Sequence, residues 1–261
     1  GQHWLVNAGI YEKLITALEL TSNDTVLEVG PGLGTLTDHL LAGGGRVIAI
    51  EKDPALVKYL QKHYTGQNQI EIIQDDILKF NPRYKIPDIR YKIVGNIPYY
   101  LTSHLFRVIF TTWPLPELMV LMVQKEVAQR IVAKPPAMSL LAVSVQYYAQ
   151  PKIIARVSRG SFWPAPTVDS AIIKLETRDK PPATKQASRK FFRVVKAGFA
   201  GKRKQLANNL ASGLKIGKTA ALEQLRAVGI DPTRRAETLT LEEWQKLAEN
   251  GGSYVDIDLT G

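Results

Sequence analysis

The stretch Thr25-Val26-Leu27-Glu28-Val29-Gly30-Pro31-Gly32-Leu33-Gly34 decides the fold of this chain. It begins as an apolar run typical of a buried strand, and the next segment, Thr35 to Ala42, has the pattern of a helix. A glycine-rich turn between a strand and a helix is the usual place for a nucleotide cofactor in α/β proteins. Because such turns are also common without a ligand, the interpretation depends on the elements that follow.

The next predicted strand, Arg46 to Ile50, ends in an acid, Glu51, at the position where a ribose diol would lie. The glycines at positions 30, 32 and 34 allow a tight turn and close approach of the backbone to a ligand. Their spacing is G-x-G-x-G, whereas dinucleotide-binding dehydrogenases typically show G-x-G-x-x-G around a pyrophosphate. A cofactor with a ribose and an adenine but no pyrophosphate fits better, and the sequence therefore predicts S-adenosylmethionine.

Strand and helix patterns alternate along the first two thirds of the chain. This alternation predicts an α/β fold with a Rossmann-like, mainly parallel sheet covered on both faces and ligands at the carboxyl ends of its strands. The predicted strands are 25–29, 46–50, 70–74, 91–95, 118–123, 153–157 and 171–175, and the predicted helices are 9–20, 35–42, 54–63, 102–110, 124–133 and 139–148.

The pattern changes after Arg178. Residues 179–183 indicate a linker, and no strand pattern follows them. We expect a catalytic α/β domain over residues 1–178 and a small all-helical domain with a tail over residues 179–261. The predicted helices of this second domain are 187–197, 202–212, 218–227 and 240–248, the last with a good start at Thr240-Leu241-Glu242-Glu243.

The net charge of +10 is concentrated in the second domain. Between Lys180 and Arg235 there are 14 Lys and Arg against two acidic residues, a local balance of 14 − 2 = +12. Such a segment attracts phosphates without reading sequence, although a solvated helical surface has the same composition. The run Lys202-Arg203-Lys204, directly before a helical pattern, favours nucleic acid.

The segment Asn96-Ile97-Pro98-Tyr99 follows a second apolar strand pattern. The Asn96 side chain and the Pro98 backbone each offer a carbonyl acceptor, and Tyr99 offers a ring on which a flat base can stack. By itself the segment could be only a turn. Together with the glycine loop and Glu51, two acceptors for one NH2 group indicate N-methylation.

The composition excludes some classes of site. The chain has no cysteine, which excludes disulfides, thiolate metal sites and the cysteine-ligated zinc of base deaminases, and is compatible with a reducing cytoplasm. No apolar run approaches the ~20 residues of a membrane span, and the first residues have no signal-like apolar stretch. We expect a cytoplasmic protein that uses no metal and no membrane.

Six segments together resemble the KsgA-type ribosomal RNA adenine dimethylases, and the resemblance extends over essentially the whole chain. These segments are Gly1-Gln2-His3-Trp4-Leu5, the loop 28–34, Asn96 to Tyr99, Phe162-Trp163-Pro164-Ala165-Pro166-Thr167-Val168-Asp169-Ser170, the basic stretch 199–210, and Arg235-Ala236-Glu237-Thr238-Leu239. The family's usual Asn and Phe in the first segment are His3 and Trp4 here.

The resemblance implies the fold of S-adenosylmethionine-dependent methyltransferases. It also implies dimethylation of N6 on two adjacent adenosines near the 3′ end of small-subunit ribosomal RNA, with four molecules of S-adenosylmethionine used in all. The partner would be the immature small ribosomal subunit, and we expect a monomer.

The resemblance assigns residues to three roles. It implies cofactor contacts at His3, Leu5, Gly30, Gly32, Glu51, Asp76 and Asn96. It implies catalytic roles for Asn96, Pro98, Tyr99 and Phe162, with Tyr99 and Phe162 sandwiching a base swung out of its helix or loop. The expected RNA contacts are Lys202, Arg203, Lys204, Arg234 and Arg235.

Three alternatives stay open at this point. Macrolide-resistance dimethylases of large-subunit RNA share the catalytic core but generally lack the basic motif at 199–210. A DNA adenine methyltransferase would be expected to have a larger target-reading domain than the ~80 residues here. A non-catalytic ribosome assembly factor would have no need for intact Gly30, Glu51, Asp76 and Asn96.

Overall fold

The computed structural model describes residues 3–86, 90–179 and 184–250. The first two residues of the opening motif, most of the expected linker (180–183) and the tail (251–261) lie outside the described residues. The contacts between residues divide the chain into two compact units. The first contains the chain up to Gln129 together with Ala149–Arg178, and the second contains Arg130–Tyr148 together with the chain from Asp179 onward.

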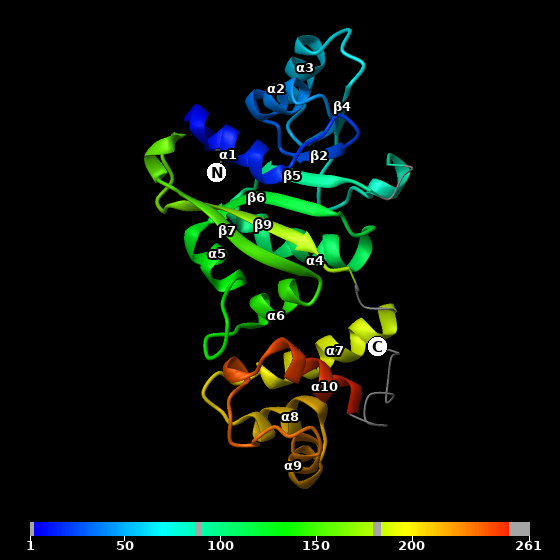
Figure 1. The fold of residues 1–261 in the computed structure, drawn as a ribbon, viewed down its shortest axis with the longest axis vertical. Coiled ribbons are helices and arrows are strands. Elements are labelled where there is room, and N and C mark those ends of the chain that lie inside the picture. Colours follow the sequence, from blue (N-terminus) through cyan, green and yellow to red (C-terminus); the bar gives the residue numbers. More distant parts are fainter. Residues whose placement is uncertain (1–2, 87–89, 180–183, 251–261) are drawn as a thin grey trace. The chain divides into compact units, whose positions relative to one another are not determined.

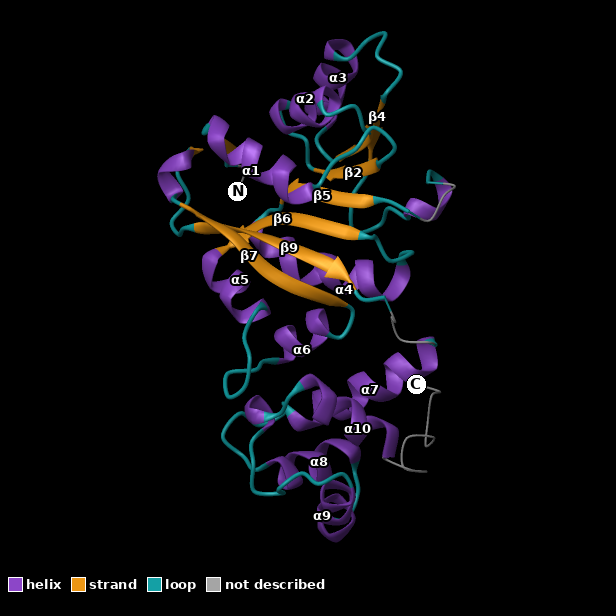
Figure 2. Cartoon of the chain, in the orientation of Figure 1, coloured by secondary structure: helices purple, strands orange, loops and turns teal. Residues whose placement is uncertain are grey.

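The first unit is built on a seven-stranded sheet in the order β4-β3-β2-β5-β6-β9-β7 (Figures 1 and 2). Strands β2 to β6 are parallel, whereas β9 lies antiparallel between β6 and β7. The strands are β2 (Thr25–Val29), β3 (Arg46–Glu51), β4 (Ile70–Gln74), β5 (Lys92–Asn96), β6 (Leu118–Gln124), β7 (Ala149–Val157) and β9 (Ser170–Thr177).

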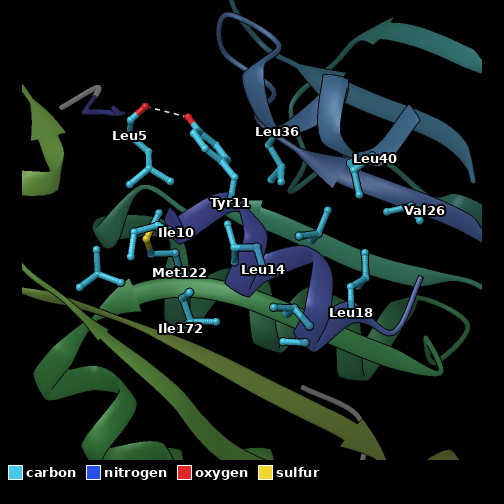
Figure 3. Close-up of a cluster of buried hydrophobic side chains, with 14 of the residues drawn as sticks. Leu5, Ile10, Tyr11, Leu14, Leu18, Val26, Leu36, Leu40, Met122 and Ile172 are labelled. Carbon is cyan, nitrogen blue, oxygen red and sulfur yellow. Dashed lines mark hydrogen bonds between the residues drawn. The ribbon is translucent and has the colours of Figure 1, made fainter. Parts of the chain in front are cut away.

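Helices cover both faces of this sheet, which explains why its central strands are almost wholly apolar. On one face, α1 and α2 pack in a core cluster with Val26, Met122 and Ile172 (Figure 3). Helix α4 lies behind the strands in the view of Figure 1. The helices of this unit are α1 (Ala8–Leu18), α2 (Thr35–Ala42), α3 (Pro54–His63) and α4 (Thr102–Thr112), and α5 (Lys125–Ile131) crosses the boundary to the second unit.

Local sequence signals explain where these helices begin. The Asn7 side chain accepts a hydrogen bond from the Gly9 amide at the start of α1. Asp53 does the same for Ala55 at the start of α3, where Pro54 occupies the first turn. Glycine is needed near the carboxyl end of β5, because a Cβ on Gly95 would lie 2.6 Å from the carbonyl oxygen of Val29 in β2.

The structure adds a two-stranded sheet that the sequence patterns did not predict. Strand β1 (Trp4–Leu5) pairs antiparallel with β8 (Phe162–Trp163), so that Trp4 lies opposite Trp163 and Leu5 opposite Phe162. Two residues are too few to show alternation, which is why neither strand has a recognisable pattern. The pairing joins the opening segment of the chain to the Phe162–Ser170 motif.

The second unit is helical in its described residues. Its helices are α6 (Leu140–Gln146), α7 (Lys185–Gly198), α8 (Leu206–Leu214), α9 (Lys218–Ala227) and α10 (Leu241–Asn250). Helix α8 begins four residues later than predicted, because a turn closed by the Lys204 amide and the Gly201 carbonyl precedes it.

The segment 130–148 groups with the second unit, whereas the sequence placed the domain boundary after residue 178. The reason lies in its contacts: the Tyr147 ring stacks on Phe191 of α7 at a centroid distance of 3.9 Å. The Met138 amide also donates to the carbonyl of Glu237 at 3.0 Å. Sequence order hides this arrangement, since β7 and β9 return to the first unit afterwards.

Candidate active site

The candidate site lies at the carboxyl ends of the parallel strands of the first unit. Between β2 and β5 the chain order reverses, because β3 and β4 lie on one side of β2 whereas β5 and β6 lie on the other. Ligands of open α/β sheets bind outside the strand ends at such a point. The glycine loop follows β2 and the Asn96 segment follows β5, so both line the predicted position.

The glycine loop adopts a backbone that only glycine accepts readily. Gly30, Gly32 and Gly34 have φ values of +68°, +60° and +88°. A Cβ on Gly30 would meet no atom within 4 Å, which leaves open space against that part of the backbone. A Cβ on Gly34 would lie 2.6 Å from the Tyr64 hydroxyl, so this glycine is also required by packing.

Glu51 is held in place by three backbone amides. Its Oε1 accepts hydrogen bonds from the amides of Lys52 at 2.8 Å and Asp53 at 2.9 Å, and its Oε2 lies 3.4 Å from the Gly32 amide. The residue is buried, and its carboxylate therefore faces the glycine loop in a fixed orientation. This is the position from which a carboxylate could accept hydrogen bonds from a ribose diol.

Asp76 is an ionised acceptor beside Glu51. Hydrogen bonding from the Leu78 amide, and then from the Lys52 ammonium at 3.0 Å, lowers the pKa of its carboxyl. Asp76 also caps the turn that follows, since its side-chain Oδ1 accepts from the Leu78 amide at 3.0 Å. The turn cap expected as the alternative is therefore present, and the contact of Asp76 with the cofactor stays a prediction.

Asn96 and Pro98 present their acceptors at the end of β5. The Asn96 Nδ2 donates to the carbonyl of His3 at 3.1 Å, which turns the Oδ1 of the same amide away from that carbonyl. The Pro98 carbonyl accepts from the Leu101 amide at 2.9 Å and keeps its second lone pair. The N-terminal segment thus fixes which atom of the Asn96 amide is offered to a ligand.

Tyr99 is fixed at both ends of its side chain. Its hydroxyl lies 2.7 Å from the Ser170 Oγ, and its ring stacks on the His3 imidazole at a centroid distance of 6.3 Å. The His3 Nδ1 is in turn 2.7 Å from the carbonyl oxygen of Pro164. His3 therefore contacts both the Asn96 segment and the Phe162–Ser170 motif.

Phe162 lies elsewhere than its predicted stacking role requires, whereas the cofactor contact expected of its neighbour Leu5 stays a prediction. Both side chains are buried in the core cluster, with Phe162 only 4% exposed, because β1 and β8 turn these two positions inward. The Leu5 carbonyl accepts from the Tyr11 hydroxyl (Figure 3). In this arrangement Phe162 is not available to a base, and its predicted partnership with Tyr99 would require the side chain to leave the core.

Glu28 is the most perturbed acid of the site. It is fully buried under the glycine loop, and burial raises the pKa of its carboxyl to about 8. Its Oε2 accepts from the Thr37 hydroxyl at 2.6 Å, whereas its Oε1 has no partner among the described residues. Glu28 is therefore predominantly a neutral carboxylic acid at pH 7.

A family model described as "Ribosomal RNA adenine dimethylase" matches residues 1–250 of the chain. The chain belongs to this family. The family resemblance, the methyltransferase fold and the enzyme class that we expected from the sequence are confirmed.

Several proteins with assigned names are similar to this dimethylase. "Ribosomal RNA small subunit methyltransferase A" of Dehalococcoides mccartyi (strain CBDB1) is 46% identical over 248 residues, which span 95% of this chain and 85% of that protein. The protein of the same name from Pelotomaculum thermopropionicum is 41% identical over 264 residues, spanning 96% and 89%.

Two solved structures share the fold of this dimethylase over nearly its whole length. A dimethyladenosine transferase from Plasmodium falciparum has a TM-score of 0.81 and 29% identity, covering 94% of this chain and 96% of that one. The 23S rRNA methyltransferase ErmE has a TM-score of 0.76 and 27% identity, covering 95% and 98%.

The basic residues expected to contact RNA differ in their surroundings. Lys202, Arg203, Lys204 and Arg235 of the dimethylase are exposed. The expectation for Arg234 is corrected: its guanidinium forms a two-pronged ion pair with Glu243 and donates to the Thr238 hydroxyl and carbonyl. These bonds engage all three of its nitrogens, so Arg234 links its turn to the start of α10 instead of facing a phosphate.

Sequence reasoning also missed residues that support the site. Lys52 pairs with Asp76, and Ser170 bonds to Tyr99. Ser170 is the last residue of the quoted Phe162–Ser170 motif, which was a usable signal, whereas Lys52 has no distinguishing context. Within the described part of the chain, no group of three or more His, Cys, Asp or Glu is placed to hold a metal, and no helix could cross a membrane.

Proposed function

We propose that this dimethylase transfers methyl groups from S-adenosylmethionine to N6 of two adjacent adenosines near the 3′ end of small-subunit ribosomal RNA. The observation that carries the proposal is the pair of acceptors at the end of β5, the Asn96 Oδ1 and the Pro98 carbonyl, next to a glycine loop suited to an adenosine-containing donor.

The residues present fit S-adenosylmethionine. Gly30 leaves open space against its backbone, the amide-held carboxylate of Glu51 suits the ribose hydroxyls, and the ionised Asp76 suits the adenine amine. The donor supplies an electron-poor methyl group on a sulfonium. None of these residues needs to move a proton to hold it, which matches their roles as acceptors.

The target amine is a weak nucleophile, because its lone pair is delocalised into the adenine ring. By accepting both N6 hydrogens, the Asn96 Oδ1 and the Pro98 carbonyl favour a tetrahedral nitrogen and stabilise its growing positive charge. The lone pair forms the new N–C bond, the C–S electrons remain on sulfur, and the nitrogen then loses a proton to water. After the first transfer only one N6 hydrogen remains to be held.

Tyr99 provides the ring on which the extruded base stacks. The Ser170 hydroxyl holds the Tyr99 side chain in place. The base would stack on the Tyr99 ring, either in place of the His3 imidazole or together with it. Base stacking on an aromatic side chain contributes ~1 to 3 kcal/mol per base. This contribution helps offset the free energy needed to unstack the adenosine from its neighbours.

Two observations favour small-subunit over large-subunit RNA. The named relatives at 41 to 46% identity are small subunit methyltransferases, whereas the 23S rRNA methyltransferase is 27% identical. The basic residues before α8 are exposed in the second unit, where they can contact RNA phosphates. A macrolide-resistance type of large-subunit dimethylase is the second candidate, because ErmE shares the fold.

The experiment is to incubate the protein with labelled S-adenosylmethionine and, in parallel, unmethylated small subunits, large subunits and duplex DNA. Mass spectrometry of the nucleosides should find N6,N6-dimethyladenosine from the small subunits only. Label predominantly in large-subunit RNA would support the second candidate, and no label in any substrate would contradict a methyltransferase role.

A further inference from the structure

Exposed apolar side chains gather on the loops around the active site. The first unit has seven large hydrophobic residues that the structure describes as exposed. Of these, one lies in β8 and four lie in the segments that directly follow β1, β2, β5 and β8. The five are Val6, Leu33, Tyr100, Trp163 and Val168. Trp163 is the largest of them and is 67% exposed, although exposed indoles are unfavourable in water.

Trp163 does not stand alone, because it stacks on Trp4. The two indoles are nearly parallel, with an interplanar angle of 15° and ring centroids 6.3 Å apart, and they lie opposite each other in the β1–β8 pairing. Trp4 in turn lies beside the glycine loop, since a Cβ on Gly32 would be 3.5 Å from its ring. Trp163 therefore stacks on a ring that lies beside the glycine loop, and much of the Trp163 side chain stays exposed to solvent.

The same two strands connect this pair to the catalytic acceptors. His3, next to Trp4, accepts the hydrogen bond from Asn96, and Pro164, next to Trp163, contacts the His3 ring. Each indole is thus one residue away from a group that contacts the site of methyl transfer. A ligand that covers Trp163 would be continuous with one bound at Asn96.

We infer that the Trp4–Trp163 pair is a stacking platform for a nucleobase that flanks the target adenosine in single-stranded RNA. This inference rests on the proposed function, and it assigns a second base subsite beside Tyr99. Every nucleobase has a face that can stack on an indole, so the platform binds without reading sequence.

The charge beside the platform suits the same ligand. Arg159 is exposed in the turn that leads into β8, and its guanidinium makes no ion pair with a described residue. Arg159 precedes Trp163 by four residues in the chain, and a long cationic side chain at that separation can contact the phosphate of the stacked nucleotide. An aromatic platform with an unpaired guanidinium a few residues away in the chain is typical of single-strand binding surfaces and favours RNA over an apolar protein partner.

The test compares Trp163→Ala and Trp163→Phe with Tyr84→Ala. Tyr84 is the control, because it is an aromatic residue even more exposed, at 83%, but lies in the turn Pro82–Tyr84, ahead of the amino end of β5. With unmethylated small subunits, Trp163→Ala should raise KM about 5- to 150-fold, the range that corresponds to one lost base stack. Trp163→Phe should recover most of this loss, and Tyr84→Ala should behave as wild type.

A second readout does not depend on methylation. The two tryptophans outside the pair, Trp113 and Trp244, are buried, so quenching of fluorescence by a short single-stranded oligoadenylate reports mainly on the platform. Trp163→Ala should abolish most of this quenching while the affinity for S-adenosylmethionine stays unchanged. Wild-type quenching without methylation would contradict the proposed function and leave the platform supported.

Three results would overturn the inference. The first is a Trp163→Ala protein with unchanged KM and unchanged sensitivity to the oligonucleotide. The second is a Trp163→Phe protein as impaired as Trp163→Ala, which would indicate bulk and not stacking. The third is a defect with complete subunits but none with protein-free ribosomal RNA, which would assign Trp163 to a ribosomal protein.

Discussion

At the scale of single residues, Asn96 shows how one hydrogen bond selects the chemistry of an amide. Because its Nδ2 donates to the His3 carbonyl, its Oδ1 is the atom left for a ligand, and an acceptor is what an amine nucleophile requires. The partner is a backbone carbonyl, so the replacement of the family's usual Asn by His at position 3 does not remove this contact.

We expect Asn96→Ala to bind S-adenosylmethionine nearly as well as wild type and to lose turnover by about 100-fold or more, the size of effect seen when one transition-state hydrogen bond is removed. Calorimetric titration with the donor and single-turnover methylation of small subunits measure the two quantities separately. Near-normal turnover by this variant would remove Asn96 from the mechanism.

Glu28 makes stability depend on pH. Its pKa is about 8 in the folded chain and 4.5 in the unfolded one, so between these values the folded state holds a proton that the unfolded state has lost. The free energy of unfolding therefore falls as pH rises through this window, by up to about 1.4 kcal/mol per pH unit. The groups that face Glu28 are Thr37, Asp38 and Glu51.

Glu28→Gln removes this titration. The melting temperature of Glu28→Gln minus that of the wild type should increase steadily from pH 5.5 to 7.5, whatever the value of this difference at pH 5.5. Paired thermal melts at several pH values in this range measure the trend. A difference that does not change with pH would show that Glu28 is not held neutral by its burial.

At the scale of elements, the start of α10 is a reciprocal cap. The Thr240 hydroxyl accepts from the Glu243 amide at 3.2 Å, while the Glu243 carboxylate accepts from the Thr240 amide at 2.7 Å. This is the capping box that Thr240-Leu241-Glu242-Glu243 predicts. Glu243 also pairs with Arg234, so the cap joins α10 to the turn before it.

The neighbours Arg234 and Arg235 should therefore give opposite phenotypes. Arg234→Ala should lower the free energy of unfolding by about 1 to 2 kcal/mol, since the pair is only partly shielded from solvent. Arg235→Ala should change stability by less than about 0.5 kcal/mol and reduce the salt dependence of RNA binding by about one ion. Denaturant melts measure the stability of each variant, and filter binding at several salt concentrations measures the salt dependence of RNA binding. Equal stabilities of the two variants would contradict the structural role of Arg234.

The elements themselves were largely predictable from the sequence. Strands such as Thr25–Val29 and helices such as Pro54–His63 carry clear periodicity and caps, and the structure has them at the predicted residues. The pairing of β1 with β8 was not predictable, because two-residue strands have no periodicity and their partners lie far apart in sequence. The inward position of Phe162 depends on that long-range pairing. The ion pair of Arg234 spans only nine residues, to Glu243, but it depends on how the turn before α10 folds, which has no repeating pattern.

At the scale of the whole molecule, chemistry and charge are divided between the two units. The glycine loop, Glu51, Asp76 and Asn96 belong to the first unit, whereas the exposed Lys202, Arg203 and Lys204 belong to the second. Phosphate binding by the second unit would raise the local concentration of RNA without selecting a nucleotide. Selection would then depend on the acceptors and aromatic rings of the first unit.

Replacing Lys202, Arg203 and Lys204 together by Gln should weaken binding to small subunits and reduce the slope of log affinity against log salt by about 2 to 3. The affinity for S-adenosylmethionine should not change, because these residues belong to the other unit. Binding measured between 50 and 200 mM salt tests this expectation, and an unchanged slope would place the RNA surface elsewhere.

The central claim is that the Asn96 Oδ1 and the Pro98 carbonyl hold the target amine within reach of the donor's methyl group. Its most direct test is a crystal structure of the protein with S-adenosylmethionine bound. The account predicts the sulfonium methyl directed toward these two oxygens, with the ribose at Glu51 and the adenine at Asp76. A methyl group directed away from Asn96 and Pro98 would contradict it.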